Sequence, residues 1–303
     1  MSIDRVESLV YGVEDMEACV RFLEDWGLER IEAGSHGATF RTPENQHVVL
    51  LGIGDPALPP NLEEGPTVRE TVWGVSGEAH LKAIVDELSS DRDVAEDGNG
   101  TFHSMDDAGL GIGFRLKDEV DVAGSEPVQN FKEHVPRLNA RIDQIDRPRP
   151  MRIGHVVFNI PRTIREKAVS FYTGRLGFRI TDAVTGMGDF MRPDGSTYHH
   201  VLFLAHRDRD GAPAKTAFNH VAYEVRDFEE IVIGGKWMRD RGWDTSRSPG
   251  RHNLGSNLHW YFACPLGGEI EYFSDMDRMD DDWETRHWDE PPVVNFWKAE
   301  IVL

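Results

Sequence analysis

The sequence has 303 residues, enough for two domains of ordinary size. It is 39% hydrophobic and 10% aromatic, so it can bury a real core and is not an intrinsically disordered chain. Its 53 acidic and 33 basic residues give a formal net charge of −20, which repels nucleic acid and anionic membranes and excludes both as main partners. Solubility is the favoured explanation of this acidity, and a halotolerant source is the alternative.

The cysteines and the N-terminus indicate the compartment. Cys19 and Cys264 are far apart and form no CxxC motif, which favours a reducing compartment and argues against a zinc-thiolate site. The chain starts with Asp4, Arg5 and Glu7 where a signal peptide would have a basic stretch and then an apolar run. No apolar run approaches the ~20 residues of a membrane span. We therefore expect a cytoplasmic protein that handles small molecules.

Taken in chain order, the predicted elements of the first half recur in the second. Amphipathic helices are recognised by their spacing of apolar residues, and strands by alternation. The first half should contain strand 6–11, helix 16–26, strands 38–41, 48–51 and 71–75, helix 78–88 and strand 111–115. The second half should contain strand 153–158, a helix ending at 176, strands 198–204 and 220–225, a helix around 228–241 and strand 269–273.

This internal repeat predicts an α+β fold of two domains. Each domain is expected to contain two βαβββ modules whose mixed sheets curl into a half-open barrel. The predicted division is an N-terminal domain at 1–135, a linker at 136–150, a C-terminal domain at 151–276 and a tail at 277–303. The linker assignment follows from its proline and arginine content.

Aligning the two halves isolates a candidate metal site. The alignment puts two histidines and a glutamate opposite three residues that form no such set: His155, His220 and Glu271 opposite Ser8, Glu70 and Gly113. Two imidazoles and one carboxylate form the facial triad of non-haem Fe(II) oxygenases, which leaves three positions of an octahedral ion open. A single strand histidine is more often structural. The prediction therefore depends on the three equivalent positions together, and it makes the C-terminal domain the metal-binding and catalytic one.

Residues 250–271 resemble the signature of type I extradiol ring-cleaving dioxygenases, which belong to the vicinal oxygen chelate superfamily. The family pattern is G-x-H, then an apolar residue followed by tyrosine, then P-x-G and a glutamate ligand. The matching residues are His252, Tyr261, Pro265, Gly267 and Glu271. Trp260 and Cys264 depart from the pattern, but both flank the site. The resemblance covers nearly the whole chain and is closest to homoprotocatechuate and catechol 2,3-dioxygenase-like enzymes, although Val157 stands where such an enzyme has asparagine.

The resemblance implies an extradiol dioxygenase of aromatic catabolism. It would use Fe(II), with Mn(II) as the alternative, and O2 to open a catecholic ring beside the diol, giving a muconic semialdehyde-type product. Family members are commonly homo-oligomers, so a tetramer or dimer is expected. The tail, at 286–297, resembles a lid over the pocket.

The resemblance also assigns roles to individual side chains. His199 would be the acid/base, while Tyr261 and His252 would hydrogen-bond the substrate oxygens. Arg247 and Arg286 would hold a substrate carboxylate. The other histidines of this half are expected to be structural or exposed: His200, His206, His259 and His287.

Two other classes of function remain as alternatives. One is another metal-dependent enzyme of the superfamily, such as a hydroxyphenylpyruvate dioxygenase-like protein, although that group lacks a counterpart of segment 250–271. Glyoxalase I and fosfomycin-resistance proteins are disfavoured, because they split their ligands between modules or chains. The other class is a non-catalytic small-molecule binding protein, which would need no metal triad.

Overall fold

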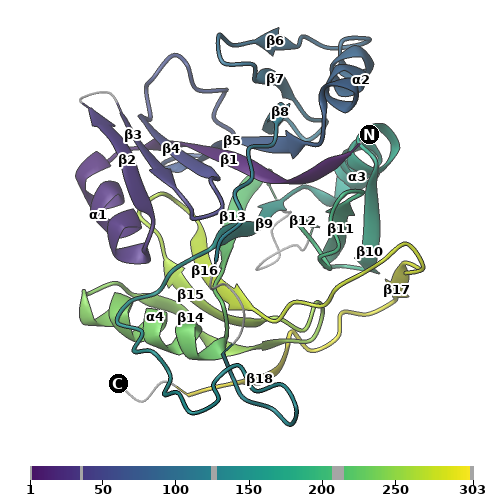
Figure 1. The fold of residues 1–303 in the computed structure, drawn as a ribbon. Coiled ribbons are helices and arrows are strands. Elements are labelled where there is room, and N and C mark those ends of the chain that lie inside the picture. The colour runs from purple at the N-terminus through teal and green to yellow at the C-terminus, as the bar shows by residue number, and fades with distance from the viewer. Residues whose placement is uncertain (1, 35–36, 124–127, 207–214, 301–303) are drawn as a thin grey trace.

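The first half forms a mixed sheet flanked by amphipathic helices (Figure 1). The computed structural model describes residues 2–34, 37–123, 128–206 and 215–300. The strands and helices of the first half are β1 (Ile3–Val13), α1 (Met16–Trp26), β2 (Glu29–Gly34), β3 (Gly37–Arg41), β4 (His47–Gly52), β5 (Thr67–Val75), α2 (Glu78–Leu88), β6 (Ala95–Glu96), β7 (Phe102–Met105) and β8 (Gly111–Leu116). The strand order is β2-β3-β4-β1-β5-β8-β7-β6.

The second half repeats this plan and adds two short strands from the tail. Its elements are β9 (Arg152–Asn159), α3 (Arg165–Ser170), β10 (Phe178–Val184), β11 (Gly188–Pro193), β12 (Leu202–Ala205), β13 (Ala217–Glu224), α4 (Phe228–Asp240), β14 (Thr245–His252), β15 (Leu258–Ala263), β16 (Glu269–Ser274), β17 (Arg286–Trp288) and β18 (Asn295–Lys298). The strand order is β17-β10-β11-β12-β9-β13-β16-β15-β14-β18. The predicted α+β architecture of two large mixed sheets is confirmed.

Helix α1 illustrates how local sequence sets these elements. The Asp15 side chain accepts a hydrogen bond from the Ala18 amide and caps the first turn. Phe22 and Trp26 lie on the buried face. Gly27 ends the helix at a φ of 107°, a left-handed conformation that glycine adopts at little cost. The apolar spacing and the glycine stop were both visible in the sequence.

The central strands of the two halves have the same register, as the alignment of the halves predicted. In the first half, Val72 of β5 pairs with both Ser8 of β1 and Gly113 of β8. In the second half the equivalent strand is β13, and its Ala222 pairs with both flanking strands, at His155 of β9 and Glu271 of β16. Differences between the halves at these positions are therefore differences of side chain on a shared scaffold.

One predicted strand is shorter than expected. The stretch 198–204 was expected to be a strand throughout, but β12 begins at Leu202. The amide of His199 donates to the carbonyl of Asp277, and the amide of Val201 donates to Met191, so the chain is held by several partners before it joins the sheet. The paired histidines that precede β12 therefore lie in a loop.

The tail connects the two edges of the second sheet. Strand β17 pairs with β10 at one edge, and β18 pairs with β14 at the other. Residues 289–294 must therefore cross from edge to edge (Figure 1). Within the described ranges, no helix is long and apolar enough to cross a membrane.

Candidate active site

The three predicted metal ligands project from neighbouring strands onto one face of the sheet. His155 and Glu271 lie opposite Ala222 on either side of β13. His220 lies two residues before Ala222, and alternate residues of a strand point to the same face. Strand order and register thus bring together residues that are far apart in sequence.

The ligand atoms of these residues converge within a buried space. One atom from each of His155, His220 and Glu271 lies within 4.8 Å of the others. The Nε2 atoms of the two histidines lie 3.2 and 3.5 Å from Glu271 Oε2. Yet this oxygen has no hydrogen-bond partner of acceptable geometry among the described residues, and Glu271 is completely buried. An anionic oxygen facing two imidazole nitrogens in this way fits a shared divalent cation.

Neighbouring amides hold two of these ligands in place. His220 Nδ1 lies 2.8 Å from Asn219 Oδ1, so an N–H at Nδ1 leaves Nε2 with a free lone pair. Asn219 in turn donates to Asn159. The amide of Asn257 donates to Glu271 Oε1 at 3.1 Å, which leaves Oε2 directed at the histidines. Such support is typical of metal ligands.

The ionisation of the site also suits a cation. Burial lowers the pKa of His220 to about 4, so the ring is neutral and its nitrogen can bind a metal. Burial alone would raise the pKa of Glu271, but the adjacent imidazoles of His155 and His220 bring it well below its usual range. The carboxylate therefore stays charged.

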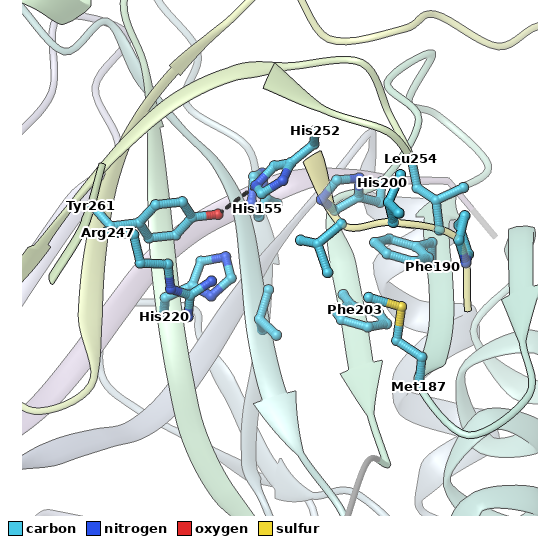
Figure 2. Close-up of a pocket in the computed structure, with 14 residues that line it drawn as sticks. His155, Met187, Phe190, His200, Phe203, His220, Arg247, His252, Leu254 and Tyr261 are labelled. Carbon is cyan, nitrogen blue, oxygen red and sulfur yellow. Dashed lines mark hydrogen bonds between the residues drawn. The ribbon is translucent and has the colours of Figure 1, made fainter. Parts of the chain in front are cut away.

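A cavity of about 100 Å³ opens above the two histidines and has one polar and one apolar side. On the polar side, Figure 2 shows Tyr261 and Arg247 beside His220, with His252 hydrogen-bonded to the Tyr261 hydroxyl. On the opposite side, Figure 2 shows the apolar side chains of Met187, Phe190, Phe203 and Leu254. The cavity is also lined by Val157 and by three residues of the crossing tail, Pro292, Val293 and Val294.

The structure places the two adjacent histidines, His199 and His200, in different surroundings. His200 was expected to be structural or exposed, but it is buried and lines the cavity, with its ring centroid 4.3 Å from that of His155. His199, the predicted acid/base, is absent from the cavity lining, because its ring points to Asp182 and His200. Adjacent residues in a loop point in different directions, and the sequence gives no sign of which one faces the cavity.

The two predicted carboxylate-binding arginines lie in different places. Arg247 lines the cavity, but its guanidinium is paired with Glu269 and packs over the Tyr261 ring at 4.4 Å. Arg286 is exposed on β17, with its guanidinium 4.3 Å from the Trp283 ring, and is not among the residues that line the cavity. The structure therefore brings only Arg247 to the cavity, and the binding of a substrate carboxylate by the two arginines stays a prediction.

The remaining predicted residues lie as follows. Tyr261 is buried on β15, and its hydroxyl is 2.9 Å from His252 Nε2. The ring of His259 stacks on that of His252 at 4.0 Å. Sequence reasoning missed His200, the supporting amides and the apolar side of the cavity. Among these features, only Asn219 had a signal in the sequence, because it is adjacent to the predicted ligand His220.

Comparison with known proteins places this half of the chain. Residues 152–268 match the model of the Glyoxalase/Bleomycin resistance protein/Dioxygenase superfamily. These residues form a domain of that superfamily. The chain is also similar in sequence to metapyrocatechase 2 of Cupriavidus necator, at 31% identity over 134 residues, or 44% of this chain and 39% of that protein. The chain thus spans well under half the length of this curated relative.

Solved structures extend the similarity of fold to the first half. The Mn(II)-bound glyoxalase from Novosphingobium aromaticivorans superposes with a TM-score of 0.74 at 21% identity, covering 98% of this chain and 91% of that one. A halotolerant catechol dioxygenase, BphC, also superposes with a TM-score of 0.74, at 16% identity, covering 99% and 95%. At these identities the comparison establishes the fold of the superfamily across both halves.

Proposed function

We propose that this chain is an extradiol dioxygenase that uses O2 to open a catecholic ring beside its two hydroxyls. The observation that carries the proposal is the convergence of His155, His220 and Glu271 at a cavity that is also lined by His200 and His252. Similarity to metapyrocatechase 2 supports it. The product would be a muconic semialdehyde.

The resident metal is proposed to be Fe(II), held by the two histidines and Glu271. A bound Fe(II) would supply adjacent open positions for a catechol and O2, together with the redox activity that allows them to react. Mn(II) accepts the same ligands, and a glyoxalase of this fold binds it. Metal analysis of the purified protein distinguishes the two.

The side chains around the metal handle the protons and the orientation of the substrate. His200 is proposed to take a proton from a substrate hydroxyl, since it is the histidine beside His155 at the cavity wall. Burial and its histidine neighbours lower the pKa of His200, so its ring is neutral at pH 7 and has a nitrogen free to accept. Tyr261 and His252 hold the substrate oxygens by hydrogen bonds.

The cavity favours a single-ring catechol with an apolar substituent over an acidic one. A buried carboxylate needs a cationic partner, and Arg247 is already paired with Glu269. A cavity of ~150 Å³ holds benzene, so the 100 Å³ here suits one ring better than two. Val157 and Met187 would contact the substituent.

The test of the proposed function is anaerobic loading with Fe(II), followed by O2 and a panel of catechols. Wild type should give yellow ring-opened product, and His155→Ala should lose both stoichiometric iron and activity. His206→Ala is the matched control, because His206 is buried outside the cavity lining. No product from any catechol, or full activity of His155→Ala, would refute the proposal.

The substrate preference has a separate test. 4-Methylcatechol should exceed 3,4-dihydroxyphenylacetate in kcat/KM by about 10²-fold, the cost of leaving a buried charge unpaired. Glu269→Gln should narrow this gap, because it releases the Arg247 guanidinium. 2,3-Dihydroxybiphenyl, a catechol with two rings, tests whether the cavity suits one ring better than two. If the wild-type protein preferred the acidic catechol, the proposed preference for an apolar substituent would be wrong, but the proposal of ring cleavage would stand.

A further inference from the structure

His200 belongs to a hydrogen-bonded row of three buried side chains, and the reaction outlined above does not use the other two, His199 and Asp182. His200 Nδ1 lies 3.0 Å from His199 Nδ1, and His199 Nε2 lies 2.6 Å from Asp182 Oδ2. The three residues are at most 4% exposed. The other carboxylate oxygen of Asp182 accepts a hydrogen bond from the Trp288 indole at 2.6 Å. The row therefore runs from the cavity wall to strand β17 of the tail.

The ability of each group to donate or accept a hydrogen bond determines which nitrogen atoms in this row carry a proton. An ionised carboxylate only accepts hydrogen bonds, so His199 must carry a proton on Nε2. A neutral His199 then has a bare Nδ1, which can only accept. For a neutral His199, the proton between the two rings therefore lies on Nδ1 of His200. This leaves the Nε2 of His200 without a proton.

We propose that His199 and Asp182 are positioning residues that set the tautomer of His200. They direct its Nδ1–H away from the cavity and leave the Nε2 lone pair as the proton acceptor. Figure 2 shows the His200 ring at the cavity wall, between His155 and Phe190. The use of this lone pair as a general base rests on the proposed function. The tautomer itself does not.

The packing around the row prevents the rings of His199 and His200 from reorienting. Phe190 packs against both histidines, with ring centroids 5.4 Å from His199 and 5.1 Å from His200. A Cβ added at Gly255 would lie 3.1 Å from His199 Nδ1, so the backbone also closes on this side. Buried rings held in this way cannot reorient to form the alternative pairing without repacking.

The tautomers are tested by ¹⁵N NMR spectroscopy of the full chain labelled at histidine. Spectra are recorded with and without Zn(II), a diamagnetic ion that accepts the same ligands. Signals are assigned with His199→Gln and His200→Gln. We expect His200 as the Nδ1–H tautomer and His199 as the Nε2–H tautomer. A His200 that carries its proton on Nε2, or a doubly protonated His199, would overturn the proposal. The wild-type spectrum decides this even where a variant fails to fold.

Asp182→Asn should reverse the order of protons. The new amide donates to His199 Nε2, so His199 carries its proton on Nδ1 and His200 on Nε2. With the base nitrogen blocked, kcat should fall ~10²–10⁴-fold, the usual contribution of a general base, with KM changed only a few-fold. The same loss of a tautomer follows an Asp-to-Asn change in a Ser-His-Asp triad. Asp182→Glu should restore part of kcat.

Asp106→Asn is the matched control. Asp106 is also a buried carboxylate that accepts from an aromatic residue, Tyr172, but it lies on the other half of the chain. It should change neither the tautomers nor kcat. Unchanged tautomers in Asp182→Asn would refute the proposal. Failure of wild type to open any catechol would refute the proposed function and leave the tautomer result standing.

Discussion

The hydroxyl of Tyr261 and the ring of His252 form a hydrogen-bonded polar pair at the cavity. Burial raises the pKa of Tyr261 well above its usual value, and the nearby Glu271 carboxylate adds to this effect. Burial, helped by the adjacent His259, lowers the pKa of His252 to about 3. Both groups are therefore neutral at pH 7 and share one hydrogen bond of 2.9 Å. A neutral pair can donate a hydrogen bond to a substrate oxygen without adding charge to the cavity.

Tyr261→Phe should lower kcat by about 10²-fold, which is typical when one preorganised donor is lost from a buried site. The iron content should stay stoichiometric, because the phenol is not part of the metal-binding set. Steady-state kinetics on the iron-loaded variant checks this. Tyr272→Phe is the control, since it also removes a buried hydroxyl, which donates to the Trp26 carbonyl, and neither residue lines the cavity. Equal losses in the two variants would indicate a purely structural effect.

Among the elements, the turn between β7 and β8 contains a buried carboxylate that connects the two halves. Asp106 accepts hydrogen bonds from the amides of Ala108 and Leu110 through one oxygen and from the Tyr172 hydroxyl through the other. Tyr172 belongs to a π-helical turn, Phe171–Arg175, that follows α3. Burial outweighs these hydrogen bonds and raises the pKa of Asp106 to about 6.

The pH dependence of stability should reveal this group. Because the folded state holds the Asp106 proton more tightly than the unfolded chain does, stability falls as pH rises from about 4 to 6. A shift of roughly two units corresponds to about 3 kcal/mol. The free energy of unfolding should be measured with urea at pH 4, 5, 6 and 7. Between pH 4 and 7, the value for Asp106→Asn should rise relative to that of wild type by about this amount. A difference that does not vary with pH would contradict the assignment.

At the scale of the whole molecule, the two halves are joined by buried polar and aromatic contacts. The Gln46 amide donates to the carbonyls of Val6 and Ile153, and its oxygen accepts from the Ile153 amide at 2.6 Å. The Trp26 and Tyr272 rings stack at 3.5 Å across the same boundary. The first half therefore supports the strand that carries His155.

Gln46→Ala should lower the free energy of unfolding by about 3 kcal/mol or more, because it leaves buried backbone groups of Ile153 unpaired. Differential scanning calorimetry checks the loss and shows whether the halves begin to unfold separately. Gln144→Ala, whose side chain is exposed, should change stability by no more than about 0.5 kcal/mol. A similar small change in both variants would mean that Gln46 does not couple the halves.

The periodic elements were predictable because their signals are local. Apolar spacing and a glycine stop were enough for α1, and the repeat placed the strands that carry His155, His220 and Glu271 in register. Side-chain directions within loops have no such signal. The choice between His199 and His200 depends on contacts with Asp182, which is 17 residues away.

The sequence by itself determined the modular repeat, the α+β fold and the set of three candidate ligands, because each depends on spacing along the chain. The tertiary structure decided which histidine faces the cavity, that Arg247 is already paired with Glu269, and that the tail crosses between two sheet edges. These features arise from contacts between segments distant in sequence. Such contacts are set by packing and burial, which no local pattern specifies.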